Sequence, residues 1–127
     1  GCDRENLTPL EQAEKLYQAD FVVVSHNTAS DPIFNYANAI AQKLWELDWE
    51  QFTQTPSRLT AEPPTRSERE ELLAAVRRQG YIDNYWGVRV TPSGRRFRIE
   101  QVTVWNLYDA ENNYQGQAAT FRNWVDL

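Results

Sequence analysis

The chain has 127 residues, with 13 Lys and Arg against 18 Asp and Glu, a formal net charge of −5 and 41% hydrophobic residues. This length suits one domain, and the acidic balance argues against general nucleic-acid binding, which needs a basic surface. Cys2 is the only cysteine and His26 the only histidine, so neither an internal disulfide nor a thiolate or histidine-rich metal site is expected. Apolar runs are too short to span a membrane, and the cysteine usage predicts a cytoplasmic protein.

The first 20 residues are predicted to form an extension, 1–20, ahead of a single domain at 21–127. Within it, Thr8 and Glu11 form a capping box, and apolar residues follow at helical spacing through 7–18. This pattern predicts a short amphipathic helix. It is interpreted either as a lid on its own domain or as a contact with a second copy or a partner protein.

Strands and helices alternate in the next part of the chain. The pattern predicts strands at 21–26 and 33–36 and helices at 37–46 and 49–52. Asp48 and Gln51 form a capping box for the second of these helices. Its two aromatic residues, Trp49 and Phe52, are both expected in the core.

A proline-bounded loop at 53–65 leads into the longest predicted helix, 65–79, which Gly80 ends. Arg58 in this loop has two interpretations. It either clamps a carboxylate or phosphate, or holds the loop down through backbone carbonyls or Glu62, and the second is favoured.

Three β-rich runs joined by short polar turns close the chain and predict an antiparallel meander with strands at 81–91, 95–108 and 114–123. In the first strand, simple alternation places one set of residues on one face: Ile82, Asn84, Trp86, Val88 and Val90. In the second strand the apolar parity changes between Ile99 and Val102. This predicts either a β-bulge near Glu100 and Gln101 or two covered faces, the second of them beneath the N-terminal helix.

Three runs carry a resemblance to a known family: FNYANAIAQKLWELDWEQFTQTPSRLTAEP, GYIDNYWGVRVTPSGRRFRIEQVTVWNLYD and GQAATFRNW. They resemble the MEKHLA domain, a PAS-related family of bacterial, notably cyanobacterial, proteins and of plant homeodomain–leucine zipper transcription factors. The resemblance implies an α+β, PAS-like fold over 21–127. Its five-stranded antiparallel sheet has the order 2-1-5-4-3, with helices on one face.

The same resemblance implies a sensory or regulatory module in signalling that acts through protein–protein interaction, a fold-level inference. A homodimer or a signalling partner is expected to contact the N-terminal helix and the open sheet face. The alternative function is a sensor that binds a small molecule non-covalently between the sheet and the helices.

Covalent flavin attachment needs a cysteine within 37–79, and haem ligation a histidine on the helix at 65–80, and neither is present. No cofactor is therefore expected, although a non-covalent small ligand stays open. The candidate ligand-binding residues are Phe34, Asn38, Trp45, Arg58, Asn84, Trp86, Gln101, Trp105 and Gln117, with Ile99 and Ala119 as further walls. The competing interpretation is that the tryptophans fill this space.

A catalytic set of His26, Asp31 and Glu100 is the third hypothesis. The chain offers no paired nucleophile and no metal set to go with it. We therefore expect no enzyme activity, no catalytic residue and no metal.

Overall fold

The structure is a computed structural model that describes residues 9–61 and 66–127. Its strands are β1 (Val22–His26), β2 (Phe34–Ala37), β3 (Tyr81–Val90), β4 (Arg96–Tyr108), β5 (Tyr114–Phe121) and β6 (Asn123–Asp126). Its helices are α1 (Pro9–Tyr17), α2 (Ala39–Trp45), α3 (Trp49–Phe52), the 3₁₀ helix η2 (Ser57–Thr60) and α4 (Arg66–Gln79). No helix in the described ranges is long and apolar enough to cross a membrane.

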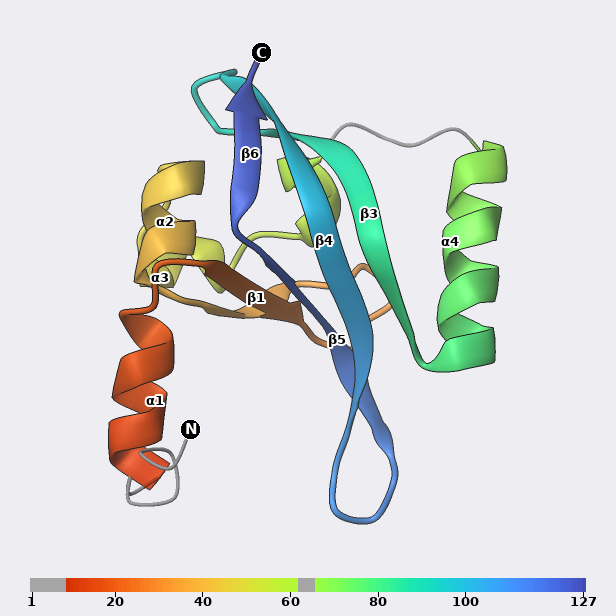
Figure 1. Cartoon of the computed structure of the whole chain (residues 1–127). Helices are drawn as coiled ribbons and strands as arrows, with labels where there is room; N and C mark the ends of the chain where they lie inside the picture. Colours follow the sequence, from red (N-terminus) through yellow and green to blue (C-terminus); the bar gives the residue numbers. More distant parts are fainter. Residues whose placement is uncertain (1–8, 62–65) are drawn as a thin grey trace.

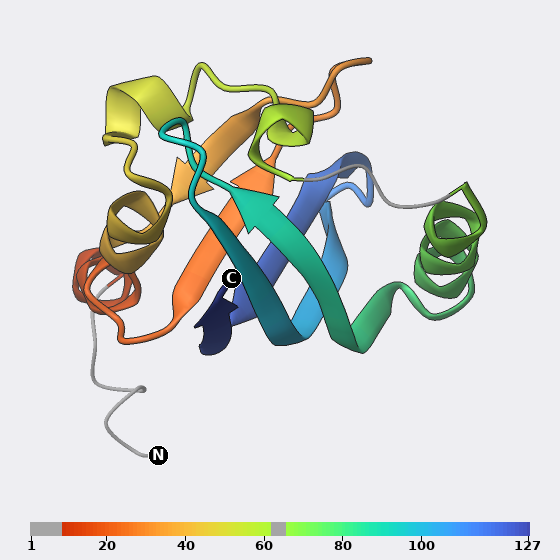
Figure 2. The ribbon, with the colours of Figure 1, turned by 90° about the horizontal axis from the view of Figure 1, so that it is seen from above.

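All strands belong to one antiparallel sheet with the order β2-β1-β5-β4-β3, as the sequence predicts. A sixth strand, β6, was not expected. It pairs with β4 beyond the end of β5, through a register that joins Ile99 to Trp124. Helices α2 and α3 lie together near β1 and β2, and α4 stands beside β3 at the other end of the sheet (Figures 1 and 2).

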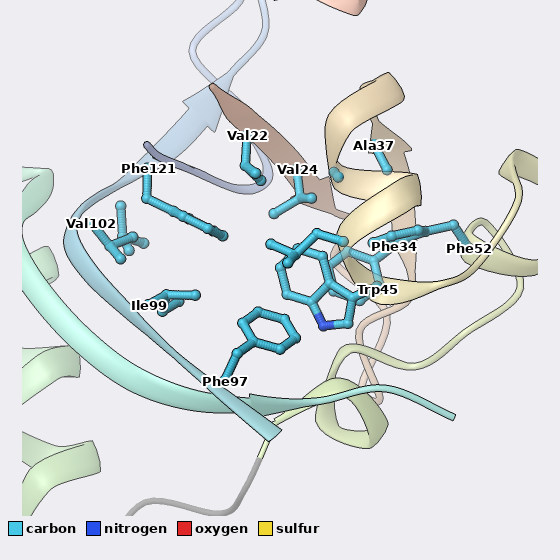
Figure 3. Close-up of a cluster of buried hydrophobic side chains, with 13 residues drawn as sticks. Val22, Val24, Phe34, Ala37, Trp45, Phe52, Phe97, Ile99, Val102 and Phe121 are labelled. Carbon is cyan, nitrogen blue, oxygen red and sulfur yellow. The ribbon is translucent and has the colours of Figure 1, made fainter. Parts of the chain in front are cut away.

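The hydrophobic core fills one face of the sheet, here called the inner face, which packs against α2 and α3. Trp45 of α2 is 2% exposed and lies among aromatic rings that it meets edge to face (Figure 3). Its ring centroid is 5.4 Å from that of Phe97 and 5.7 Å from that of Phe52. Edge-to-face packing of this kind adds to the stabilisation that burial of the rings provides.

A β-bulge in β4 explains the change of apolar parity. Gln101 has a φ of 52°, and the strand register runs from Gly87 opposite Ile99 to Tyr85 opposite Val102. Three steps along β4 therefore match two along β3. Ile99 and Val102, both buried, thus keep to the inner face, which confirms the first of the two alternatives.

A second bulge, in β3, makes the predicted alternation of that strand wrong. Asn84 has a φ of 55°, and the register passes from Ile82 opposite Val104 to Tyr85 opposite Val102. The extra residue shifts the parity, so Ile82 and Tyr85 pack on the core whereas Trp86 is 60% exposed. We call this uncovered side the outer face.

One further expectation about the helices is wrong. Trp49 is not a core residue with Phe52: it is 41% exposed and meets the Tyr36 ring edge to face at 5.7 Å. The apolar stripe of α1 is largely exposed, with Leu10 at 70%, and α1 does not cover Trp86, so the alternative in which this helix covers the outer face does not hold. The predicted cap Thr8, the predicted loop partner Glu62 and the predicted first residue of the long helix, Thr65, lie outside the described residues.

Candidate ligand-binding cavity

A cavity of about 250 Å³ lies on the inner face of the sheet. The strands supply its floor, and its remaining walls come from η2, from Trp45 of α2 and from Leu72 of α4. The five tryptophans therefore do not fill the space between the sheet and the helices. This position agrees with the prediction of a pocket between them.

The interior of the cavity is apolar. Trp45, Phe34 and Phe121 bring three aromatic rings to its surface, and Ile99 and Val102 bring aliphatic groups from β4. All five side chains are buried and belong to the main core cluster (Figure 3). A ligand here would replace water by close apolar contact, which is the main source of affinity in such pockets.

Four polar residues from four elements also line the cavity: His26, Arg58, Arg89 and Gln117. The His26 Nδ1 lies 2.9 Å from the carbonyl oxygen of Asn27. Gln117 donates from Nε2 to Asn106 Oδ1 at 3.2 Å. These hydrogen bonds fix two side chains that can orient a ligand, while the remaining two are arginines.

The bulge at Asn84 is what brings Arg89 into the cavity. Without the extra residue, Tyr85 and Arg89 would follow the outer-face parity that simple alternation predicts. With it, both side chains face inward, and the Arg89 guanidinium carbon lies 5.9 Å from the centroid of the Tyr85 ring. An irregularity in the strand thus sets the polar chemistry of the cavity.

Some of the residues predicted for the site meet here and others do not. Four of them line the cavity, namely Phe34, Trp45, Arg58 and Gln117, together with the two expected walls Ile99 and Ala119. Asn84, Trp86 and Gln101 gather instead at a shallow surface hollow that they share with Arg98 and Glu100. The prediction that this second group lines the same pocket is wrong, because the two bulges turn these residues outward.

Asn38 and Trp105 also lie away from the cavity. Asn38 is completely buried as the N-cap of α2, and its side chain bonds only to backbone groups. Trp105 follows the inner-facing Val104 along β4, pairs with Ala118 and is half-buried on the outer face. Neither residue therefore lines this cavity.

Sequence reasoning missed Tyr85 and Arg89 as cavity residues, and it weighed His26 as a catalytic or a structural group but not as a cavity residue. A signal for the first two was present in Asp83-Asn84, because asparagine is one of the few residues that readily adopts a positive φ within a strand. For His26 the signal was its position at the inner-face end of β1. Alternation of apolar and polar residues along each strand was not enough to place Tyr85, Arg89 or His26 in the cavity.

The three residues of the catalytic hypothesis are not assembled. His26 lines the cavity, whereas Asp31 forms an ion pair with Arg58 at 3.1 Å. Glu100 pairs with Arg98 of the same strand at 3.0 Å. Within the described part of the chain, no group of three or more His, Cys, Asp or Glu residues is placed to hold a metal ion.

The sequence matches the family model described as the MEKHLA domain over residues 2–126. No match is found among curated proteins. Solved structures do resemble the fold. A PAS domain of a Colwellia psychrerythraea protein matches with a TM-score of 0.74 and 18% identity, over 93% of this chain and 95% of that one.

Two longer proteins with light-oxygen-voltage or blue-light functions also resemble this fold. An RNA-binding light-oxygen-voltage receptor matches with a TM-score of 0.73 and 17% identity, over 95% of this chain and 33% of that one. The blue-light activated histidine kinase EL346 of Erythrobacter litoralis gives 0.66 and 14%, over 91% and 36%. The present chain thus spans about a third of each, and the likeness shows the fold alone.

Proposed function

The chain belongs to the MEKHLA domain family and has a PAS-like fold, and we propose that it is a sensory module that binds a small molecule non-covalently in its cavity. The observation that carries this proposal is the apolar cavity of about 250 Å³ on the inner face of the sheet. Small domains normally fill such a space, since interiors pack to high density. A cavity kept open between sheet and helices suits a ligand.

The non-covalent mode follows from the residues that form the wall. The described lining residues include no cysteine, and His26 lies at a strand end beside Gln117 and not on the long helix. We therefore propose no thioether-linked flavin and no haem as the resident group. We also propose no catalytic step, because the residues of the catalytic hypothesis lie apart.

A binding assay on a filled cavity tests this function. Ala119→Leu adds volume on the inner face, where Ala119 lines the cavity, and Ala74→Leu makes the same change at an exposed position on α4. A ligand-observed NMR screen with small organic compounds should find binders of the native chain. Those binders should be lost in Ala119→Leu and retained in Ala74→Leu. Equal binding by both variants would place the ligand elsewhere and overturn the proposal.

The second candidate function is a protein-interaction module, and it rests on the outer face. Trp86 is 60% exposed there beside Arg98 and Glu100, and large aromatics are enriched at interfaces. A ligand signal could leave the domain through this surface, to a second copy or a partner. In sedimentation velocity, Trp86→Arg should weaken self-association, whereas Tyr108→Arg, at an aromatic residue 53% exposed on the β4–β5 hairpin, should not. Equal self-association of the two variants would show that the outer face around Trp86 is not the interaction surface.

A further inference from the structure

We propose that the ligand of the cavity is a small organic acid, whose apolar body lies against Trp45 and whose carboxylate is bound by Arg89 with help from Arg58. This inference deepens the proposed function and rests on it. It names a chemical class that neither the family match nor the similar structures assign.

The charge of the cavity wall is the first argument. The described lining residues include Arg58, Arg89 and His26 but no aspartate or glutamate. The chain as a whole carries a net charge of −5. A wall with cations and no carboxylate, in an acidic protein, therefore differs from the rest of the molecule and attracts anions locally.

The surroundings of Arg89 are the second argument. Its side chain is half-buried and has two described contacts, a hydrogen bond from Nη1 to the carbonyl oxygen of Val88 at 3.1 Å and the face of the Tyr85 ring. Among the residues whose side chains the structure describes, no carboxylate forms an ion pair with Arg89. A guanidinium has five N–H donors, and a half-buried cation is stabilised strongly by an anion that accepts from two of them.

The position of Arg58 adds a second, more accessible cation. Ala61, just after η2, forms a β-bridge with Arg89, so η2 runs against the part of β3 that carries this arginine. Arg58 is 66% exposed and donates from Nε to both carboxylate oxygens of Asp31 at 3.1 Å. Asp31 therefore competes with a bound acid for Arg58, whereas Arg89 has no such competitor in the described residues.

The apolar part of the cavity determines the size and the apolar character of the ligand body. Aromatic and aliphatic side chains form the floor, and the volume of about 250 Å³ lies below the roughly 300–1,000 Å³ of typical drug-sized pockets. A body of about six to ten carbon atoms, aliphatic or with one aromatic ring, is the size expected from that comparison. Burial of this body provides affinity, and the arginines provide selectivity for the charge.

Ligands that share an apolar body but differ in charge distinguish the contribution of the carboxylate to binding from that of the apolar body. The probes are straight-chain and phenyl-substituted carboxylic acids of six to ten carbons, their primary amides and the corresponding amines, titrated calorimetrically into the full chain. We expect each acid to bind at least about tenfold more tightly than its amide, because charge-assisted hydrogen bonds are the stronger ones, and the amines to bind most weakly. Amides or amines that bind as well as the acids would overturn the inference and leave the small-molecule function in place. Binding by no member of any set would overturn both.

Variants assign the selectivity to the arginines. Arg89→Gln should reduce the preference for acid over amide to about twofold or less, and Arg89→Lys should restore part of it. Arg122→Gln removes the same charge at an exposed residue that pairs with Asp20 and should leave the preference unchanged. Equal preferences in Arg89→Gln and Arg122→Gln would show that Arg89 is not the anion-binding residue.

The exposed pair gives a second test that does not depend on the folding of the Arg89 variants. Asp31→Asn removes the competing carboxylate from Arg58 and should tighten acid binding, whereas Arg58→Gln should weaken it. A purely structural role of this ion pair would make both variants change binding in the same direction. That result would remove Arg58 from the site.

Discussion

The side-chain nitrogen of Asn38 donates to the carbonyl oxygen of Leu16 at 3.2 Å, so the N-cap of α2 holds the C-terminal end of α1. The same nitrogen donates to the carbonyl oxygen of Phe21 at 2.8 Å, and Oδ1 accepts from the backbone N–H groups of Val23 and Ala41. Every hydrogen-bonding position of the amide is therefore used. One buried side chain thus joins the N-terminal helix α1, the strand β1 and the helix α2.

Asn38→Ala should therefore be costly. It removes the cap of α2 and leaves the carbonyl oxygen of Phe21 and the N–H of Val23 without this partner, which predicts a loss of about 2–4 kcal/mol in the free energy of unfolding. Asn35→Ala is the control, because Asn35 is exposed and accepts only from Ser25 Oγ in the described structure. Urea unfolding monitored by circular dichroism measures both. Comparable losses in the two variants would contradict this role of Asn38.

Trp45 and Trp49 allow a direct comparison of a core tryptophan with a surface one. Trp45→Ala should reduce the free energy of unfolding by about 3–5 kcal/mol, because Trp45 is 2% exposed and packs on several rings. Trp49→Ala should cost about 1 kcal/mol or less, since Trp49 is 41% exposed. Urea midpoints of the two variants decide the point. If Trp49→Ala were the more damaging variant, Trp45 would not be the centre of the core.

Gly116 is required by the close approach of β5 to the end of β1. Its φ is 125°, and a Cβ at this residue would collide with the carbonyl oxygen of His26. Gly116→Ala should therefore destabilise the fold by about 2–4 kcal/mol. Gly80→Ala has the unfavourable backbone angle without a collision, since nothing lies near its Cβ position, and should cost about 1 kcal/mol. Similar urea midpoints for the two variants would show that the backbone angle alone, and not the contact with His26, matters.

Glu46 makes the stability of the fold depend slightly on pH in the acid range. The hydrogen bond from Ser93 and then the contacts with Arg95 hold the pKa of the Glu46 carboxyl below its usual range. A lowered pKa in the folded state adds stability above the usual glutamate pKa of about 4.3, and this stability is lost as the pH falls through the lowered value. Glu46→Gln should therefore lose less stability than the native chain between about pH 5 and pH 3.

The measurement for Glu46 is the urea midpoint as a function of pH. The control is Glu50→Gln, at an exposed glutamate in the first turn of α3. It should keep the acid dependence of the native chain. If Glu46→Gln kept it as well, the contact between the C-terminal end of α2 and the β3–β4 turn would not contribute.

The short polar turns were enough to predict the meander of β3, β4 and β5, whereas the order of all five strands came from the resemblance to a known family. The capping box of Asp48 and Gln51 was also readable, since it depends on neighbours in the chain, and both of its hydrogen bonds are present. Phe34 and Trp45 were correctly expected in one pocket, because each lies on the apolar stripe of its element.

The side chains at Asn84, Trp86 and Gln101 could not be placed by alternation. Each bulge moves all following side chains of its strand to the opposite face of the sheet. The position of a bulge depends on how the strand pairs with its neighbour, and the sequence of one strand does not show this pairing. Only the parity change between Ile99 and Val102 was visible, because both residues are apolar. Residues beyond the bulge in β3, Arg89 above all, were therefore assigned to the wrong face, and this part of the polar lining was missed although Arg58 and Gln117 were expected.

Native mass spectrometry of the full chain, isolated without denaturation from the cells that produce it, shows whether the cavity is occupied. We expect a mass above that of the polypeptide that is lost on denaturation, and we expect the released compound to be a small organic acid. A polypeptide that carries no extra mass, either as a monomer or as a dimer, would contradict the claim that the cavity holds a ligand. The exposed outer face would then be the better guide to its function.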